Sequence, residues 1–199
     1  MTTANKVTIL RMLLIPFFVV EALYYVKTGK ELFRLAAILA FGIAAICDGV
    51  DGYIARHYNQ RSELGAILDP LADKLLLVSG IVLFTFDNQP YFGTIPLWLT
   101  GTIIGRDLML LIGWAVIHST VGKVKVRPRI LGKLATVLQM ISLVWILLQW
   151  DTQFPSAWFW TWTLSAAICT GISGLLYVWD GMKQLSSHPT SSATTDKEM

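Results

Sequence analysis

Four aspartates lie close together in a chain that otherwise carries few charges. Asp48 and Asp51 are three residues apart, and Asp69 and Asp73 are four residues apart. On a helix, either spacing places both carboxylates of a pair on one face. A charge inside a membrane costs about 2.5–3.5 kcal/mol on the insertion scale, so four carboxylates need a neutralising partner. Hard divalent cations bound through carboxylate oxygens are the usual partner.

The residues between the two pairs predict a helical hairpin. Gly65 permits a tight turn or close packing, and Arg56 and Arg61 are polar enough to lie in water. We expect one membrane helix to end near Ala55 and the next to begin near Ile67, so that the two pairs face each other near the membrane surface. That arrangement has room for one or two Mg²⁺ or Mn²⁺ ions, since oxygen-only ligands suit both metals. Two such ions can clamp a phosphate diester or anhydride for displacement.

The composition indicates an integral membrane protein. Of the 199 residues, 54% are hydrophobic and only 15% are charged, whereas a soluble domain has about 25% charged residues. The mean hydropathy is +0.57. Cys47 and Cys169 have no CxxC or CxxH partner, so we expect free thiols and no zinc site.

The apolar runs predict an all-α polytopic membrane protein with six transmembrane helices and a short N-terminal interfacial helix. Residues 1–11 form the interfacial segment, and residues 27–34 form a polar connection after the first span. The membrane domain covers residues 1–183, and a Ser- and Thr-rich tail at 184–199 should be disordered. The expected spans are about residues 13–26, 35–55, 67–86, 95–117, 134–150 and 158–178.

The distribution of positive charge predicts that the N-terminus and all four aspartates face the cytoplasm. The loops at 87–94 and 151–156 carry no Lys or Arg and would lie outside, as the positive-inside rule requires. The exception is the first outer loop, which holds Lys27, Lys30 and Arg34. The basic residues on the inner side would be Lys6, Arg11, Arg56, Arg61, Lys123, Lys125, Arg127, Arg129, Lys133 and Lys183.

The aspartates and their neighbours resemble the signature of the CDP-alcohol phosphatidyltransferase family. The resemblance covers about residues 5–183 and weakens after residue 139. It implies an enzyme that transfers the phosphatidyl group of a CDP-activated lipid to an alcohol and releases CMP. All eight defining positions match within 26 residues: Asp48, Asp51, Gly52, Ala55, Arg56, Gly65, Asp69 and Asp73.

The resemblance also implies which residues bind the metal and which bind the CDP-lipid. Asp48, Asp51 and Asp69 would be metal ligands. Asp73 would contact the metal and also take the proton of the acceptor hydroxyl, which a positioned carboxylate can do. Residues that bind the CDP-lipid would be Asn5, Thr8, Gly52, Arg56, Ser62 and Gly65.

Some of these residues have a plainer interpretation. Asn5, Thr8 and Arg11 match an Asn-x2-Thr-x2-Arg pattern that lies beside the nucleotide in similar proteins, but they also suit a helix cap and a positive anchor. Arg56 has the planar fork for bidentate phosphate contact, although an Arg at a membrane end often serves as an anchor. The aspartates as a group would also suit an ion pathway, but then the matching glycines and Arg56 would have no explanation.

Two cations further along the chain are candidates for binding the acceptor. Arg106 lies near the middle of the fourth expected span, next to Asp107. It forms either a local ion pair or the floor of a cavity that binds an anionic acceptor. Lys133 lies in a Gly-Lys-x2-Thr-x2-Gln element at 132–139, which resembles one found in the phosphatidylglycerophosphate synthase and cardiolipin synthase branch. By that resemblance, Lys133 would hold an acceptor phosphate.

These cations favour glycerol 3-phosphate as the acceptor, with CDP-diacylglycerol as the donor and phosphatidylglycerophosphate as the product. The alternative is a cardiolipin synthase that uses phosphatidylglycerol, because Gly105-Arg106-Asp107 is closer to the eukaryotic-type cardiolipin synthases. Related enzymes are often homodimers, and the aromatic and small residues here are compatible with one. We expect the inner membrane of a bacterium as the location, and no nucleic-acid partner.

Overall fold

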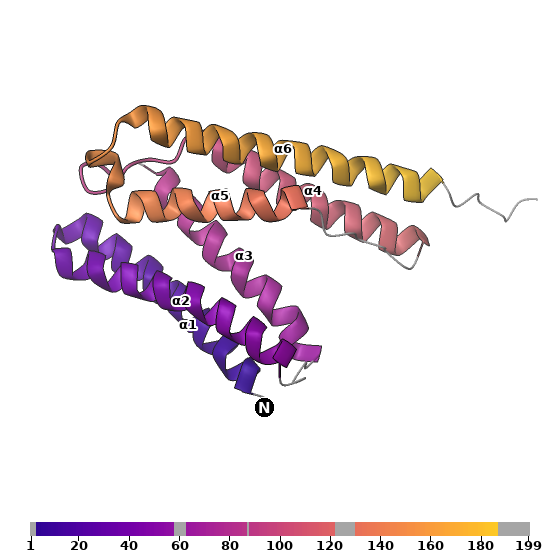
Figure 1. The fold of residues 1–199 in the computed structure, drawn as a ribbon, viewed down its shortest axis with the longest axis horizontal. Coiled ribbons are helices and arrows are strands. Elements are labelled where there is room, and N and C mark those ends of the chain that lie inside the picture. The colour runs from indigo at the N-terminus through magenta and orange to yellow at the C-terminus, as the bar shows by residue number, and fades with distance from the viewer. Residues whose placement is uncertain (1–2, 58–62, 87, 122–129, 187–199) are drawn as a thin grey trace, which may run out of the picture.

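The computed structural model describes residues 3–57, 63–86, 88–121 and 130–186. These residues form six α-helices and one 3-10 turn, and they contain no strand (Figure 1). The predicted all-helical fold is therefore confirmed. The elements are α1 (Thr3–Thr28), α2 (Glu31–His57), α3 (Glu63–Thr85), α4 (Leu97–Val121), α5 (Ile130–Leu147), η1 (Trp150–Thr152) and α6 (Ser156–Ser186).

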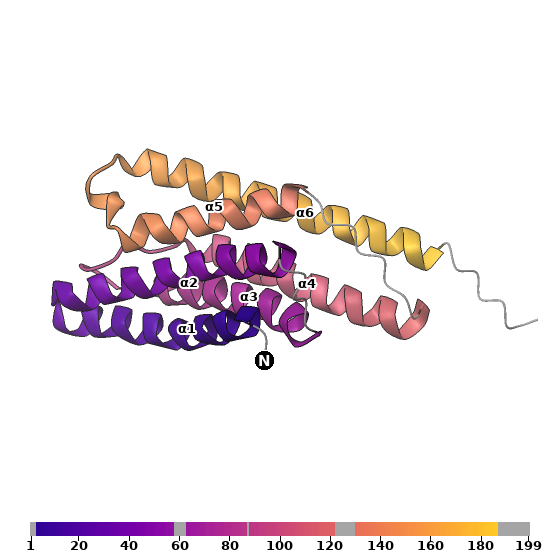
Figure 2. The same cartoon turned by 60° about the horizontal axis from the view of Figure 1, so that its bottom comes forward.

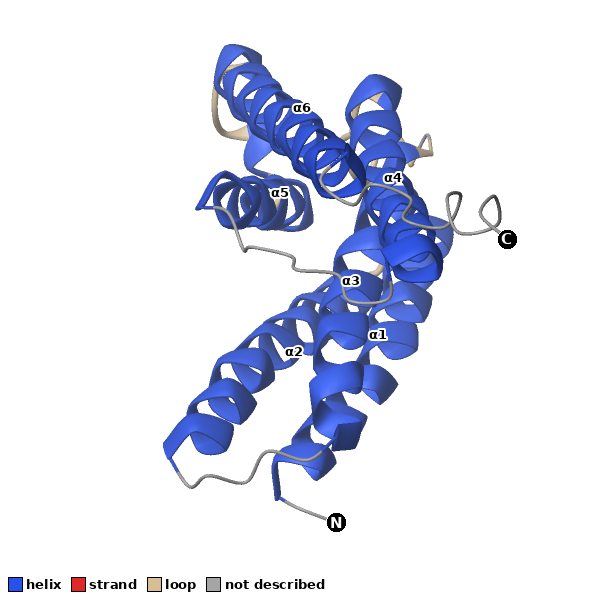
Figure 3. Ribbon diagram, turned by 90° about the vertical axis from the view of Figure 1, so that its right-hand side faces the viewer, coloured by secondary structure: helices blue, strands red, loops and turns tan. Residues whose placement is uncertain are grey.

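The helices form two groups that meet along α3. In one group α1 packs along α2, and in the other α6 packs against both α4 and α5. Helix α3 runs between the groups and contacts α1 on one side and α4 and α5 on the other (Figure 3). Successive helices alternate in direction, so α1, α3 and α5 begin at the same end of the bundle where α2, α4 and α6 finish (Figure 2). We call this end the inner end.

Four helices of the described chain are long and apolar enough to cross a membrane. They are Val7–Thr28, Glu31–Val50, Ile130–Leu147 and Ser156–Met182. Helices α3 and α4 overlap the third and fourth predicted spans and pack beside these four, so the described residues supply four of the six predicted membrane-crossing helices. The chain is therefore an integral membrane protein, as its composition predicts.

A regular stripe of buried residues explains how α1 packs. The segment expected to be interfacial continues unbroken through Pro16 into the first span. Small alanines on α2 let the two helix backbones approach closely, and the ring of Phe18 meets that of Phe41 with their centroids 5.4 Å apart. Since residues three and four apart share a face, the face that buries apolar side chains also carries two polar ones at the inner end. The stripe is Thr8, Arg11, Ile15, Phe18, Ala22 and Tyr25, opposite Ala37, Ala40 and Ala44.

The connection between the first two spans is shorter than the expected 27–34. Helix α1 continues to Thr28 and α2 begins at Glu31. Gly29 turns the chain with φ +67°, and its backbone N–H donates to the carbonyl of Tyr25 at 2.8 Å. A Cβ at this position would lie 2.7 Å from the hydroxyl of Tyr91. Because glycine alone fits both the φ angle and the space, the polar residues after it form the first turn of α2 instead of a loop.

The opposite, outer end is held together by the side chain of Gln149. Its amide N–H donates to the carbonyl oxygen of Tyr91 at 2.6 Å and to the hydroxyl of Tyr25 at 2.9 Å, and its amide oxygen accepts from Arg34. Arg34 also pairs with Glu31 at 2.7 Å. Arg34, one of the three basic residues that depart from the positive-inside rule, therefore joins α2 to the segment that follows α5.

Candidate active site

An ion pair joins α1 to α2 at the inner end of the bundle. The guanidinium of Arg11 donates to Oδ1 of Asp48, and the Arg11 side chain is fully buried whereas that of Asp48 is 49% exposed. Asp48 lies one helical turn beyond Ala44, which is buried against α1. The packing of the two helices thus brings a positive charge to the first aspartate while leaving its carboxylate accessible.

Asp73 approaches this pair from α3. It is partly buried. Its carboxylate is repelled by the carboxylate of Asp48 and attracted by the cations of Arg11 and Lys74. The three helices therefore converge on one charged region. This convergence follows from the contacts of α1 with both α2 and α3.

The other two aspartates lie on the same helices, but their side chains are outside the described part of the structure. Asp51 follows Asp48 within α2, and Asp69 precedes Asp73 within α3. Both segments are continuous helices, which is the backbone condition under which each pair would share a helix face. No cluster of three metal-ligating side chains is found among the described residues. Of the four signature aspartates, the two with described side chains, Asp48 and Asp73, offer oxygen donors, which suit Mg²⁺ or Mn²⁺.

The residues expected to bind the CDP-lipid are distributed over the same three helices. Asn5 and Thr8 lie in the first turns of α1, where Thr8 is buried. The helical hairpin is confirmed, because α2 ends at His57 and α3 begins at Glu63. Gly52 and Arg56 therefore lie near the end of α2 and Gly65 near the start of α3, whereas Ser62 is outside the described residues.

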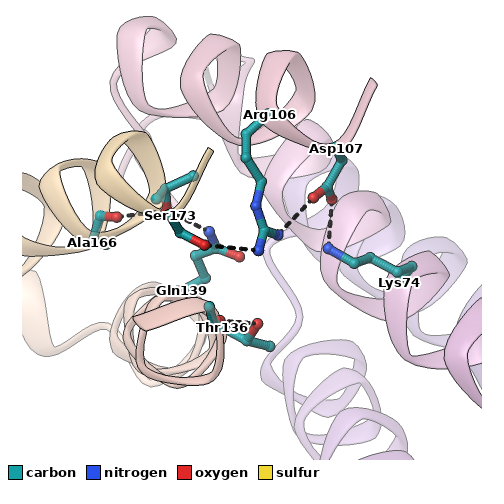
Figure 4. Close-up of polar contacts among 9 residues, drawn as sticks. Lys74, Arg106, Asp107, Thr136, Gln139, Ala166 and Ser173 are labelled. Atoms are coloured by element: carbon teal, nitrogen blue, oxygen red, sulfur yellow. Dashed lines mark hydrogen bonds and ion pairs between the residues drawn. The ribbon is translucent and has the colours of Figure 1, made fainter. Parts of the chain in front are cut away.

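A second charged cluster lies deeper in the bundle, between α3 and α4 (Figure 4). Oδ1 of Asp107 accepts from Nη1 of Arg106 at 2.8 Å, and its Oδ2 accepts from Nζ of Lys74 at 2.6 Å. Nη2 of Arg106 lies 3.5 Å from the hydroxyl of Ser173 on α6. The side chains are 10% exposed for Arg106 and 18% for Asp107, but 43% for Lys74. The carboxylate of Asp107 therefore accepts hydrogen bonds from two cations.

Two glycines make room for the side chain of Arg106. A Cβ on Gly132 of α5 would lie 3.2 Å from Nη2 of Arg106 and 3.3 Å from the hydroxyl of Ser173. A Cβ on Gly174 of α6 would lie 3.2 Å from Cγ of Arg106. Nε of Arg106 is buried and has no hydrogen-bond partner among the described atoms. The guanidinium is thus held in place with part of its donor capacity unused.

The element at 132–139 contributes mainly packing. Gly132 contacts Arg106, and the Thr136 hydroxyl donates to the carbonyl of Gly132 at 3.1 Å. The amide of Gln139 donates to the hydroxyl of Thr170 at 2.9 Å, a buried contact between α5 and α6. Lys133, the residue expected to hold a phosphate, is exposed at the start of α5.

Sequence reasoning missed the contribution of α3 to the second cluster. Lys74 is a charged residue in an apolar run directly after Asp73, and an ionisable residue at such a position signals a functional or paired role. Ser173 and Gly174 gave a weaker signal, as small residues on a helix that packs closely with its neighbours. Their convergence on Arg106 depends on contacts between α3, α4 and α6 that no local pattern specifies.

Comparison with known proteins identifies relatives along most of the chain. Residues 1–173 match the family model described as CDP-alcohol phosphatidyltransferase. A protein of Escherichia coli (strain K12) is 32% identical over 184 residues, which cover 90% of this chain and 91% of that protein. A protein of Shigella flexneri serotype 5b is 34% identical over 144 residues, or 70% of this chain and 73% of that protein. Both relatives are named CDP-diacylglycerol--glycerol-3-phosphate 3-phosphatidyltransferase.

Proposed function

We propose that this chain, which belongs to the CDP-alcohol phosphatidyltransferase family, transfers the phosphatidyl group of CDP-diacylglycerol to glycerol 3-phosphate. The products would be phosphatidylglycerophosphate and CMP. The main observation behind the proposal is that the same bundle holds an aspartate region at the inner end and a largely buried cation, Arg106, deeper inside. The names of the relatives support the same donor and acceptor.

The aspartates are the residues that would hold a divalent metal. We assign Asp48, Asp51, Asp69 and Asp73 to this role, with Arg11 balancing part of their charge. A bound Mg²⁺ or Mn²⁺ would neutralise the pyrophosphate of the CDP-lipid and stabilise the charge that develops as CMP leaves. Asn5, Thr8, Gly52, Arg56, Ser62 and Gly65 would surround the nucleotide.

Asp73 would act as the general base. In the transfer, the hydroxyl oxygen of the acceptor forms a bond to the lipid-side phosphorus, and the bond from that phosphorus to the bridging oxygen breaks. The proton of the hydroxyl goes to the carboxylate of Asp73, and the electron pair of the broken bond leaves with CMP. Asp73 suits this role because it lies on α3 between the Asp48 region and the Lys74–Asp107 contact.

Arg106 would bind the phosphate of glycerol 3-phosphate. Its guanidinium is oriented by Asp107 and Ser173, and its buried Nε has unused donor capacity. Charge-assisted hydrogen bonds from a guanidinium to phosphate are among the strong ones. Lys133, exposed near the start of α5, would provide a second positive charge at the entrance from the inner end. No structural observation favours phosphatidylglycerol as the acceptor.

This assignment places the inner end of the bundle in the cytoplasm, where a soluble phosphorylated acceptor and divalent cations are available. The predicted charge distribution supports that orientation. With bacterial relatives, the membrane would be the inner membrane.

An acceptor screen tests the proposal. Purified protein in detergent receives CDP-diacylglycerol, Mg²⁺ and one acceptor at a time: glycerol 3-phosphate, phosphatidylglycerol, inositol phosphate or serine. We expect CMP and phosphatidylglycerophosphate with glycerol 3-phosphate alone, loss of both on chelation, and recovery on adding Mg²⁺ or Mn²⁺. Product with phosphatidylglycerol alone would overturn the acceptor assignment in favour of a cardiolipin synthase. Ion flux into vesicles without CMP release from any acceptor would overturn the transferase assignment.

A further inference from the structure

The Lys74–Asp107–Arg106 cluster has one more positive charge than negative charge. Two cations share a single carboxylate, each on its own oxygen at 2.6 and 2.8 Å. Among the ion pairs described, Lys74–Asp107 is the one that joins α3 to α4, whereas Arg106–Asp107 lies within α4. The cluster therefore depends on the contact between α3 and the group formed by α4, α5 and α6.

We propose that Lys74 is a positioning residue that makes the acceptor site selective for a phosphorylated alcohol. It acts through Asp107. By neutralising this carboxylate from α3, Lys74 leaves the charge of Arg106 available to an incoming phosphate. The proposal rests on the proposed function of Arg106 as the acceptor-phosphate site.

The charge balance explains why both cations are needed. An isolated Arg106–Asp107 pair would be neutral overall and would offer little attraction to an anion. A guanidinium without Asp107 would be an uncompensated charge at bilayer depth, which is costly. With Lys74 present, Asp107 can orient Arg106 without cancelling its charge, and the phosphate compensates the remaining positive charge.

The position of Lys74 on the chain adds a second consequence. It directly follows Asp73, the proposed base, and interacts electrostatically with that carboxylate. The contact with Asp107 therefore links the turn of α3 that carries Asp73 to the residue that orients Arg106. An acceptor bound at Arg106 would be held at a fixed place relative to the base, which is the condition for efficient transfer.

Steady-state kinetics of three single variants and one double variant test the proposal in the full-length protein in detergent micelles. Lys74→Met removes the charge and keeps most of the side-chain length, Lys74→Arg is the conservative control, and Asp107→Asn removes the shared carboxylate. We expect Lys74→Met to raise the KM for glycerol 3-phosphate about tenfold or more, with the KM for CDP-diacylglycerol changed less than about twofold. Lys74→Arg should remain close to the unmodified protein.

The double variant Lys74→Met/Asp107→Asn distinguishes an effect of charge balance on acceptor binding from a purely structural role of the two ion pairs. It restores one net positive charge but has neither ion pair. We expect its KM for glycerol 3-phosphate to return to within about threefold of the original value, while kcat stays reduced because the contact that links Asp73 to Arg106 through Asp107 is lost. A double variant as impaired as Lys74→Met would overturn the proposal, and so would a Lys74→Met variant that lowers kcat alone, which would show that Lys74 acts on Asp73.

Binding of inorganic phosphate gives a readout that does not depend on the reaction. Phosphate should raise the thermal midpoint of the unmodified protein and of the double variant, and should leave that of Lys74→Met unchanged. Equal stabilisation of all three would overturn the role of Lys74. The protein could show the expected pattern of stabilisation by phosphate and yet transfer nothing to glycerol 3-phosphate. That result would support the role of Lys74 in charge balance and contradict the proposed function.

Discussion

The guanidinium of Arg11 is fully buried and bonded to the half-exposed carboxylate of Asp48. The pair joins the first two helices at the inner end, where the signature aspartates begin. Arg11 thus neutralises part of the negative charge from a buried position, while the exposed side of Asp48 remains accessible to a metal ion. This relationship connects the stability of the α1–α2 contact to the charge state of the proposed metal site.

Removing Arg11 should destabilise the protein most strongly when no metal is present. Breaking a buried ion pair costs about 3–5 kcal/mol, and the exposure of Asp48 reduces the expected loss for Arg11→Met to about 1–3 kcal/mol. A bound cation would replace the missing charge and stabilise the folded state. Thermal unfolding in detergent with chelator and with saturating Mg²⁺ measures both values. Lys30→Met, at an exposed position, is the control, and an equal loss in the two conditions would contradict the link to the metal.

Gly174→Ala should impair the acceptor site without unfolding the protein. The added Cβ would lie 3.2 Å from Cγ of Arg106, an atom too near the backbone to move freely, so α4 or α6 must shift. We expect the KM for glycerol 3-phosphate to rise about three- to tenfold. The same substitution at Gly171 on α6, where a Cβ would have no neighbour within 4 Å, should leave the KM unchanged. Equal effects at the two positions would show that the close approach to Arg106 has no functional consequence.

The contact between Gln139 and Thr170 should stabilise the fold and not contribute to acceptor binding. Thr170→Val would leave the buried amide of Gln139 without its acceptor, at a cost of about 1–3 kcal/mol in unfolding free energy. Adding Gln139→Met removes the unsatisfied group, so the double variant should regain part of the lost stability. Thermal unfolding measures this recovery. If the double variant instead lost affinity for glycerol 3-phosphate about tenfold or more, the element at 132–139 would have a direct role in the site.

Gln149 provides a test of backbone strain at the outer end. Its φ of 55° and ψ of 36° lie in the left-handed region, which glycine adopts more readily than alanine. Both Gln149→Ala and Gln149→Gly lose the side-chain bonds, so the difference between them reflects the backbone. We expect the glycine variant to be more stable by about 1 kcal/mol. At Gln153, with φ of −100°, alanine should be at least as stable as glycine, and the same order at both positions would contradict the strain argument.

The sequence predicted the helices and the hairpin well because both depend on local patterns. Long apolar runs interrupted by polar residues locate the membrane helices, and the spacing of Asp48 and Asp51 on α2 needs only a continuous helix to place both on one face. The first connection is shorter than the predicted 27–34 because Lys27 and Thr28 continue α1 and the polar residues from Glu31 onward begin α2. A turn of the kind that Gly29 makes can be compact only because glycine tolerates positive φ.

The pairing of charges between helices was not predictable in the same way. Arg106–Asp107 is visible in the sequence as adjacent residues, but the contact of Asp107 with Lys74 joins positions 33 residues apart. It depends on how closely α3 and α4 approach, which the packing of the whole bundle determines. The prediction that Lys133 holds a phosphate came from resemblance alone, and it stays a prediction, since the side chain is exposed in the described structure.

Whether the signature aspartates catalyse the transfer is tested by the rate of CMP release with glycerol 3-phosphate as acceptor, compared between Asp73→Asn and Glu21→Gln. Both substitutions neutralise a carboxylate on a membrane helix, but Glu21 lies on the outer half of α1. We expect Asp73→Asn to lower kcat by about a hundredfold or more, and Glu21→Gln to retain activity within about threefold. Undiminished formation of phosphatidylglycerophosphate by Asp73→Asn would rule out Asp73 as the general base.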